Sequence, residues 1–97
     1  MPSFGGKRIE WDEAKNVWLK KERDISFEEI ADALEDTERI FDVFPHPNRA
    51  RYPHQWVAVV LVEEYVCAVP FVFDEVKIFL KTVYKSRQLN KKYLADS

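Results

Sequence analysis

The sequence predicts a small α+β domain in which two N-terminal helices and a short C-terminal helix pack on a mostly antiparallel sheet of about four to five strands. Three observations predict it: helical spacing of apolar residues in the first third, short apolar runs joined by short links in the middle, and a capping serine near the end. Strands joined by short links pair with their neighbours, and we expect the helices to cover one side of the sheet.

The chain has 97 residues, 46% of them hydrophobic, which is enough for one compact core and too few for two. We therefore expect one domain over residues 1–97, with a flexible segment at 1–6. The sequence has no run of about eighteen apolar residues and no secretory signal, and Cys67 is its single cysteine. These features predict a protein of the reducing cytoplasm that has no disulfides and no membrane association.

The first third of the chain predicts a strand and two helices. Residues 7–11 suit a short strand, after which Asp12 can cap a helix that continues to about Arg23. Ser26 and Glu29 form a capping box at the start of the second helix. The apolar stripe of the first helix comprises Ala14, Val17, Trp18 and the stem of Lys21; that of the second comprises Phe27, Ile30, Ala31 and Leu34, opposite Glu28, Glu29, Asp32 and Glu35.

The middle of the chain predicts three strands. Residues 39–44 suit a strand, and three prolines then favour an irregular loop over residues 46–54. The nearly continuous apolar run 55–62 is typical of a strand covered on both faces, and a turn at 63–64 leads to a strand over residues 65–73. Pro70 lies inside that strand and implies an edge position or a bulge.

The end of the chain predicts a last strand over residues 76–84, after a turn at residues 74–75, and a final helix capped by Ser86 that continues to Leu94. Lys77, Lys81 and Lys85 are spaced by four, so we expect them on one face of the strand.

The charges are unevenly distributed along the chain. The net charge of −2 argues against general affinity for phosphate backbones. Residues 1–42 hold twelve acidic and seven basic side chains, whereas residues 77–97 hold six basic side chains against Asp96 alone. The basic end is therefore the candidate surface for an anionic partner.

A ribonuclease site is one interpretation of this basic end. Lys81, Lys85 and Arg87, approached by Lys20 or Lys21 from the first helix, could bind RNA phosphates and stabilise the charge of the cleavage transition state. Tyr93 or a histidine could assist the proton transfers. Alternatively, the lysines form a solvated face, and Arg87 pairs with a carboxylate such as that of Asp12.

Other reactive residue types favour structural roles. His46 and His54 share a proline-rich loop whose spacing matches no zinc site, so we expect no metal, and either could still donate a proton. Cys67 lies in an apolar run and suits a small buried side chain. The three tryptophans could stack on bases, but core packing is the preferred interpretation for Trp11, Trp18 and Trp56.

Three segments resemble the BrnT family of bacterial toxins, in the same order and at matching spacing. Members usually read W-D-x-x-K-x near the start, G-I-S-F-E-E about ten residues on, and (S/A)-R before a short final helix. This chain has Trp11–Asn16, Ile25–Glu29 and Ser86 followed by Arg87 at those places, and the resemblance covers about residues 8–94. It departs at residues 22–24, where Glu-Arg-Asp replaces the common Lys-His-Gly.

The resemblance implies a RelE-like fold and a metal-independent ribonuclease toxin that acts on RNA in the bacterial cytoplasm. It also implies a cognate antitoxin, a small DNA-binding protein whose dimers join two toxins in a heterotetramer, and no cofactor. Arg87 matches the motif arginine and is the first candidate for a phosphate contact, and Lys15 matches the motif lysine. The expected catalytic residues are Arg87, Lys81, Lys85 and Tyr93; the expected RNA-binding residues are Lys15, Lys20 and Lys21.

A catalytically inactive relative that keeps the fold and binds a partner protein is the alternative. The acidic net charge, the substituted residues at 22–24 and the scarcity of arginine in the central strands favour it. A stand-alone structural protein is a third possibility, but it leaves the motif match unexplained.

Overall fold

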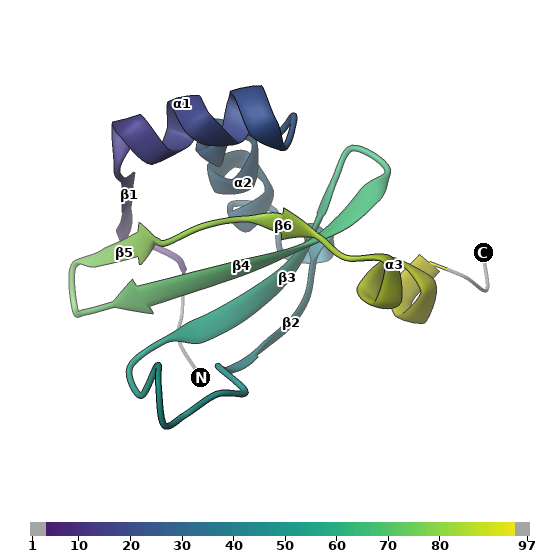
Figure 1. The fold of residues 1–97 in the computed structure, drawn as a ribbon. Coiled ribbons are helices and arrows are strands. Elements are labelled where there is room, and N and C mark those ends of the chain that lie inside the picture. The colour runs from purple at the N-terminus through teal and green to yellow at the C-terminus, as the bar shows by residue number, and fades with distance from the viewer. Residues whose placement is uncertain (1–3, 95–97) are drawn as a thin grey trace.

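The computed structural model describes residues 4–94, which form three α-helices, one short 3₁₀ helix and six strands (Figure 1). In chain order these are β1 (Arg8–Trp11), α1 (Glu13–Glu22), α2 (Phe27–Leu34), the 3₁₀ helix η1 (Thr37–Arg39), β2 (Ile40–Pro45), β3 (Trp56–Val62), β4 (Tyr65–Phe73), β5 (Lys77–Leu80), β6 (Tyr84–Lys85) and α3 (Arg87–Leu94).

A single sheet forms the centre of the fold, with strand order β1-β5-β4-β3-β2 and with β6 also paired to β4. Only β1 and β5 are parallel; the other neighbours are antiparallel. The predicted α+β class and mostly antiparallel sheet are confirmed. The sheet has six strands rather than four to five, because the strand predicted over residues 76–84 is divided into β5 and β6.

The division between β5 and β6 is a bulge that lies opposite Pro70. From the pair Phe71 with Leu80 to the pair Ala68 with Tyr84, the chain advances three residues in β4 and four on the other side. Pro70 accepts a hydrogen bond from the amide of Lys81 at 2.9 Å but has no amide hydrogen to return. Of the two predicted explanations for Pro70, the bulge is therefore correct, and it lies in the partner strand.

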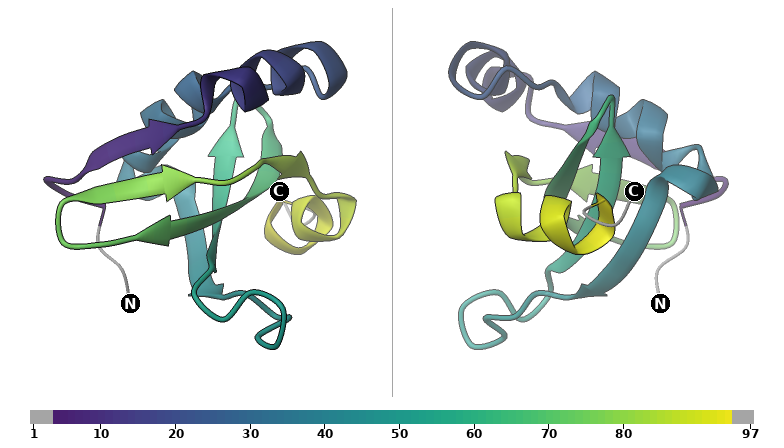
Figure 2. Two further views of the ribbon diagram at one scale, coloured as in Figure 1. Left: turned by 60° about the vertical axis from the view of Figure 1, so that its left-hand side comes forward. Right: turned by 90° about the vertical axis from the view of Figure 1, so that its right-hand side faces the viewer.

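The main core lies between the sheet and the two N-terminal helices, which cover the same face of it (Figures 1 and 2). The stripe of α2 behaves as predicted at Phe27, Ile30 and Leu34, which are at most 3% exposed. Ser26 and Glu29 make the predicted capping box at its start. From the sheet, the same core receives alternate residues such as Ala58, Val60, Cys67, Val69, Phe71, Ile78 and Leu80.

The inward face of α1 differs from the predicted one. Leu19 and Asn16 are buried, whereas Val17 is 58% exposed and Trp18 is 40% exposed. The predicted stripe of Ala14, Val17, Trp18 and Lys21 therefore faces outward, and core packing is wrong for Trp18. Trp11 and Trp56, by contrast, pack against the core as expected.

A polar junction explains why α1 turns this side inward. The side-chain oxygen of Asn16 accepts a hydrogen bond from the amide of Phe27 at 2.7 Å, and its nitrogen donates to Glu28 at 2.7 Å and to Glu13 at 3.3 Å. The ring of Trp11 stacks on Phe27 with centroids 5.8 Å apart. The two motif segments Trp11–Asn16 and Ile25–Glu29 are thus joined in one structural unit.

Helix α3 packs on the opposite face of the sheet from α1 and α2, which corrects the expectation that all helices share one side. Its Tyr93 stacks on Phe41 with centroids 5.2 Å apart and donates a hydrogen bond to Asp42 at 3.2 Å. Asp42 pairs with Val59, whose neighbours Ala58 and Val60 belong to the core on the α1 and α2 side. A second bulge, at Phe41 in β2, interrupts the register between Ile40 and Asp42 and brings these two partners of Tyr93 together.

Candidate nucleic-acid interface

The three lysines of α1 that were predicted to bind RNA lie on the side of the sheet that α1 and α2 cover. Lys20 forms an ion pair with Glu28 at 3.6 Å, and the ammonium of Lys15 lies 4.3 Å from the ring centroid of Trp18. Lys21 is exposed on the outer side of the helix. Because α1 and α3 lie on opposite faces of the sheet, the structure does not bring these lysines together with the predicted residues of α3.

Lys81 and Lys85 do not share a face, contrary to the expectation from their spacing. Lys81 lies over the ring of Phe79, 5.5 Å from its centroid, and Phe79 faces away from α1 and α2. Lys85 pairs with Cys67, a core residue on the α1 and α2 side, and lines a hollow there with Glu29, Glu63 and Glu64. The extra residue of the bulge reverses the alternation between the two lysines.

Arg87 is the first residue of α3 and is exposed. Ser86 caps this helix as predicted, because its hydroxyl accepts a hydrogen bond from the amide of Leu89 at 3.2 Å. Arg87 lines a hollow of about 410 Å³ with Tyr65, Gln88, Asn90 and Lys91. Asp12, the carboxylate considered as its alternative partner, instead caps α1 through the amide of Ala14 at 3.0 Å.

Tyr93 is fixed by its contacts rather than free to act on a substrate. Burial, followed by the negative charge of Asp42 and the hydrogen bond to it, raises the pKa of the phenol above its ordinary value. The hydroxyl is therefore protonated at neutral pH and donates to Asp42. Among the described residues, no hydrogen bond joins Tyr93 to Arg87, Lys81 or Lys85.

Part of the sheet face opposite α1 and α2 lies beyond the reach of α3, and we call it the helix-free face (Figure 2). Pairing places Phe44, Val72 and Phe79 on it, each partly exposed. Lys81 adds a positive charge beside Phe79. Lys77 also faces this side but lies 4.0 Å from Glu10 of β1, so the pair is largely neutral.

The loop between β2 and β3 adds an unpredicted basic cluster that projects from the end of these strands (Figures 1 and 2). Arg49, Arg51 and His54 are exposed, and Tyr52 packs with its ring centroid 4.5 Å from that of His46. The sequence signal was available, because no aspartate or glutamate occurs between Asp42 and Glu63. Arg49 and Arg51, which lie between His46 and His54, are therefore candidate residues that the sequence reasoning missed.

Arg23 is a second residue that the sequence reasoning missed. It lies at the end of α1 and donates hydrogen bonds to the carbonyl of Val83 at 2.7 Å and to the hydroxyl of Thr82 at 3.2 Å. Its guanidinium also lies 4.7 Å from the ring centroid of Trp18. Arg23 thus links α1 to the bulge between β5 and β6, and no sequence pattern joins positions that are 60 residues apart.

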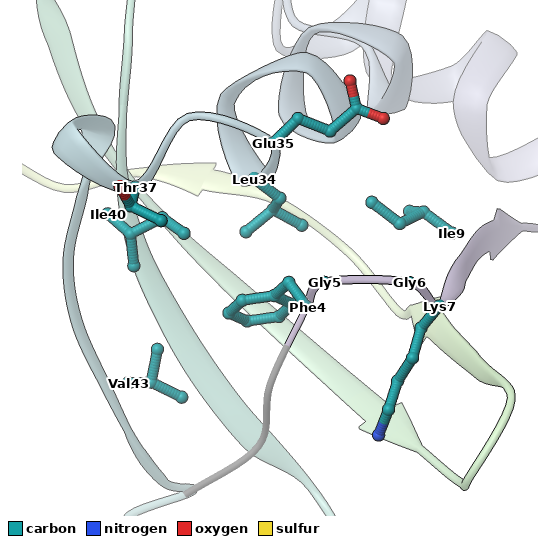
Figure 3. Close-up of a pocket in the computed structure, with 10 residues that line it drawn as sticks. All are labelled: Phe4, Gly5, Gly6, Lys7, Ile9, Leu34, Glu35, Thr37, Ile40 and Val43. Carbon is teal, nitrogen blue, oxygen red and sulfur yellow. The ribbon is translucent and has the colours of Figure 1, made fainter.

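A mostly apolar pocket of about 710 Å³ lies where the N-terminal segment meets the ends of α2 and β2 (Figure 3). Phe4 reaches into this region and contacts Phe71 with ring centroids 5.4 Å apart, whereas residues 1–3 of the segment expected to be flexible lie outside the described part of the chain. Lys7 points away from the pocket and donates to the carbonyl of Asp74 at 2.9 Å. The carboxylate of Glu35 also points outward, so no polar groups converge there.

Within residues 4–94, no group of three or more histidine, cysteine, aspartate or glutamate side chains is arranged to hold a metal ion. Burial raises the pKa of the Cys67 thiol to about 11, so the thiolate that nucleophilic chemistry requires is scarce at neutral pH. None of the described helices is long and apolar enough to cross a membrane. Comparison of the chain with protein-family models, with curated proteins and with solved structures finds no match.

Proposed function

We propose that this chain is a BrnT-like toxin of a type II toxin-antitoxin system that binds and cleaves RNA without a metal ion. The observation that carries the proposal is the helix-free face, where the partly exposed ring of Phe79 lies beside Lys81 on a sheet whose β2–β3 loop carries Arg49 and Arg51. Single-stranded RNA is bound by this combination, since bases stack on aromatic rings and cations contact the phosphates.

The backbone at Asp24 supports the resemblance on which the toxin assignment rests. Asp24 has a φ of 53°, the left-handed conformation that favours glycine, and the BrnT-like pattern commonly has glycine there. The chain turns back at this point, because the amide of Ile25 donates a hydrogen bond to the carbonyl of Leu19 at 3.5 Å. Asp24 therefore has a conformation that glycine adopts without steric cost.

Arg87 and Lys81 are the proposed phosphate ligands, because both are exposed and Lys81 belongs to the helix-free face. In the proposed step the ribose 2′-oxygen bonds to phosphorus while the bond to the 5′-oxygen breaks, and solvent water takes the 2′-hydroxyl proton and protonates the leaving oxygen. The positive charge of Arg87 or Lys81 would stabilise the additional negative charge on the phosphate. Tyr93 is left out of this site, since its single hydroxyl proton is donated to Asp42. Lys85, on the opposite face, is left out of this site.

The proposal includes a cognate antitoxin in the bacterial cytoplasm, with antitoxin dimers joining two toxins in a heterotetramer. The resemblance alone supplies this partner and its stoichiometry.

The test combines growth and cleavage measurements. Induction of the chain alone should arrest bacterial growth, and the purified protein should fragment RNA in the presence of EDTA. Arg87→Ala should relieve the arrest and slow cleavage by about 100-fold, the scale on which loss of one charge-stabilising contact acts. Lys20→Ala is the matched control, because Lys20 pairs with Glu28 on the other side of the sheet, and it should retain full activity. A soluble wild-type protein that neither arrests growth nor cuts RNA would refute the proposal.

The second candidate function is partner binding by a catalytically inactive relative. The dispersal of the four predicted catalytic residues favours it, because Lys85 lies on the far face and Tyr93 is engaged with Asp42. This candidate predicts that the protein binds an antitoxin tightly while leaving RNA intact, and that Arg87→Ala changes neither property.

A further inference from the structure

The outer side of α1 carries an apolar stripe that the fold does not use. Ala14, Val17, Trp18 and Lys21 occupy positions i, i+3, i+4 and i+7, the pattern by which a helix contacts another element, yet all four are exposed. The inward side of the same helix relies on Leu19 and on the polar Asn16. Figures 1 and 2 show α1 as the outermost element of its layer, with no other helix or strand of residues 4–94 on its outer side.

The indole of Trp18 is held in place by two cations. The ammonium of Lys15 lies 4.3 Å and the guanidinium of Arg23 4.7 Å from its ring centroid, and Arg23 is itself anchored to Val83 and Thr82. A tryptophan that is 40% exposed and already ordered loses little conformational freedom when a partner covers it. Tryptophan and arginine are also the residue types that contribute most to binding at protein interfaces.

We propose that the outer side of α1, defined by Val17, Trp18, Lys15, Lys21 and Arg23, is a docking surface for an acidic amphipathic segment of another protein. The stripe calls for apolar side chains along one side of the partner segment, because Val17 is 58% exposed in the described part of the chain. The three cations outnumber the two exposed carboxylates of α1, Glu13 and Glu22, so carboxylates on the flanks of the segment complement the surface.

RNA fits this surface less well than a protein segment. Base stacking needs an open ring face, and two cations already lie over the ring of Trp18. A second copy of the chain also fits poorly: the outer side of α2 offers the carboxylates of Glu28, Asp32 and Glu35 without exposed apolar residues to cover Val17. The proposal does not depend on ribonuclease activity.

A peptide library displayed on phage tests the proposal. Each peptide carries apolar residues at i, i+3, i+4 and i+7, and the flanking positions are either acidic or basic in equal numbers of clones. We expect the wild-type protein to enrich acidic clones over basic ones, and to retain roughly ten times more of them than Trp18→Ala does. Val76→Ala is the matched control, because Val76 is equally exposed at 58% on the β4–β5 turn, and it should retain the clones.

A charge-reversed protein provides the second measurement. Lys15→Glu combined with Lys21→Glu should change the preference from acidic to basic clones, which a merely structural role of α1 would not do. Circular dichroism and thermal unfolding show that each variant is folded. Equal retention by wild type and Trp18→Ala, or no preference between acidic and basic clones, overturns the proposal. Two further outcomes overturn it. In the first, the wild-type protein self-associates and Trp18→Ala does not, which would identify a second copy of the chain as the occupant. In the second, Trp18→Ala loses RNA binding and no peptides are enriched, which would identify RNA as the occupant.

Discussion

At the scale of single residues, Asn16 makes the most consequential contacts in the N-terminal half. It is fully buried, and each end of its side-chain amide is used, since the oxygen accepts from Phe27 and the nitrogen donates to Glu13 and Glu28. The bond from Asn16, followed by the backbone hydrogen bond at Glu28, lowers the pKa of the Glu28 carboxyl below its ordinary value. A change at this position leaves a buried amide hydrogen without an acceptor.

Asn16→Ala should lower the free energy of unfolding by about 1–3 kcal/mol, the cost of leaving a buried hydrogen-bonding group unsatisfied. Urea denaturation followed by tryptophan fluorescence measures it. Asn48→Ala, in the exposed β2–β3 loop, is the control and should cost less, because its partner Arg51 is accessible to water. An unchanged unfolding midpoint for Asn16→Ala would show that the junction does not stabilise the fold.

Asp24→Gly should stabilise the protein by roughly 0.5–1 kcal/mol, because glycine adopts the φ of 53° at position 24 without steric cost. Asp74→Gly is the comparison: Asp74 accepts hydrogen bonds from the amides of Val76 and Lys77, and its replacement should destabilise. Thermal unfolding of both variants beside the wild type measures the two signs.

At the scale of elements, the attachment of α3 depends on Tyr93 and is expected to weaken in alkali. Burial and Asp42 raise the pKa of this phenol, so the folded state favours the protonated form. The stabilising contribution is therefore complete below the ordinary tyrosine pKa of 10.0 and is lost as pH rises through the higher folded value. The reason is that a phenolate beside Asp42 would place two negative charges together.

The unfolding free energies of the wild type and Tyr93→Phe should therefore converge or cross as pH rises above about 10. Denaturant unfolding at a series of alkaline pH values measures the difference, with Tyr84→Phe, at an exposed tyrosine, as the control. A difference between wild type and Tyr93→Phe that stays constant with pH would mean that the Asp42 contact contributes nothing to holding α3.

The elements could be predicted wherever local signals agreed. Helix α2 combines a capping box with an apolar stripe, and both are present in the structure. The inward side of α1 could not be predicted from hydrophobicity, because a polar residue, Asn16, decides it through contacts with a segment eleven residues away. The side of the sheet on which Lys85 lies depends on a bulge opposite Pro70 of a neighbouring strand. Alternation of side chains along one strand cannot predict this side, because the bulge depends on the other strand.

The side on which α3 packs was predictable in part. The apolar run of β3 indicated a strand covered on both faces, and Val57 and Val59 are indeed buried on the face opposite the main core. Two covered faces require a covering element on each, which conflicts with placing every helix on one side. The candidate site was predicted less well than the fold, because sheet register and the two bulges decide which face each of its residues occupies, and they separate Lys85 from Lys81.

At the scale of the whole molecule, the net charge is small because surfaces of opposite charge balance each other. The helix-free face and the β2–β3 loop are short of carboxylates, whereas α2 carries Glu28, Asp32 and Glu35 on its outer side. We expect RNA binding to be strongly dependent on salt despite the net charge of −2.

Replacing Arg49 and Arg51 together by glutamine should weaken binding to single-stranded RNA and reduce the slope of log affinity against log salt by about 0.7 per lost phosphate contact. Fluorescence anisotropy of a labelled oligonucleotide at several salt concentrations measures the slope. Lys20→Gln removes a charge from α1 and should leave the slope unchanged. A slope that falls equally in both variants would indicate nonspecific attraction rather than a defined face.

Because of the junction at Asn16, two of the BrnT-like motifs are evidence for the fold rather than for ribonuclease activity. Two of the three matching segments meet at this buried amide, where their residues cap helices, stack rings and fix the crossing of α1 and α2. Selection for folding alone is enough to retain them. Proteins that share these two segments are therefore expected to have the same fold but not necessarily the same activity. We expect toxic and non-toxic relatives to differ instead at the exposed residues around Lys81 and Arg87.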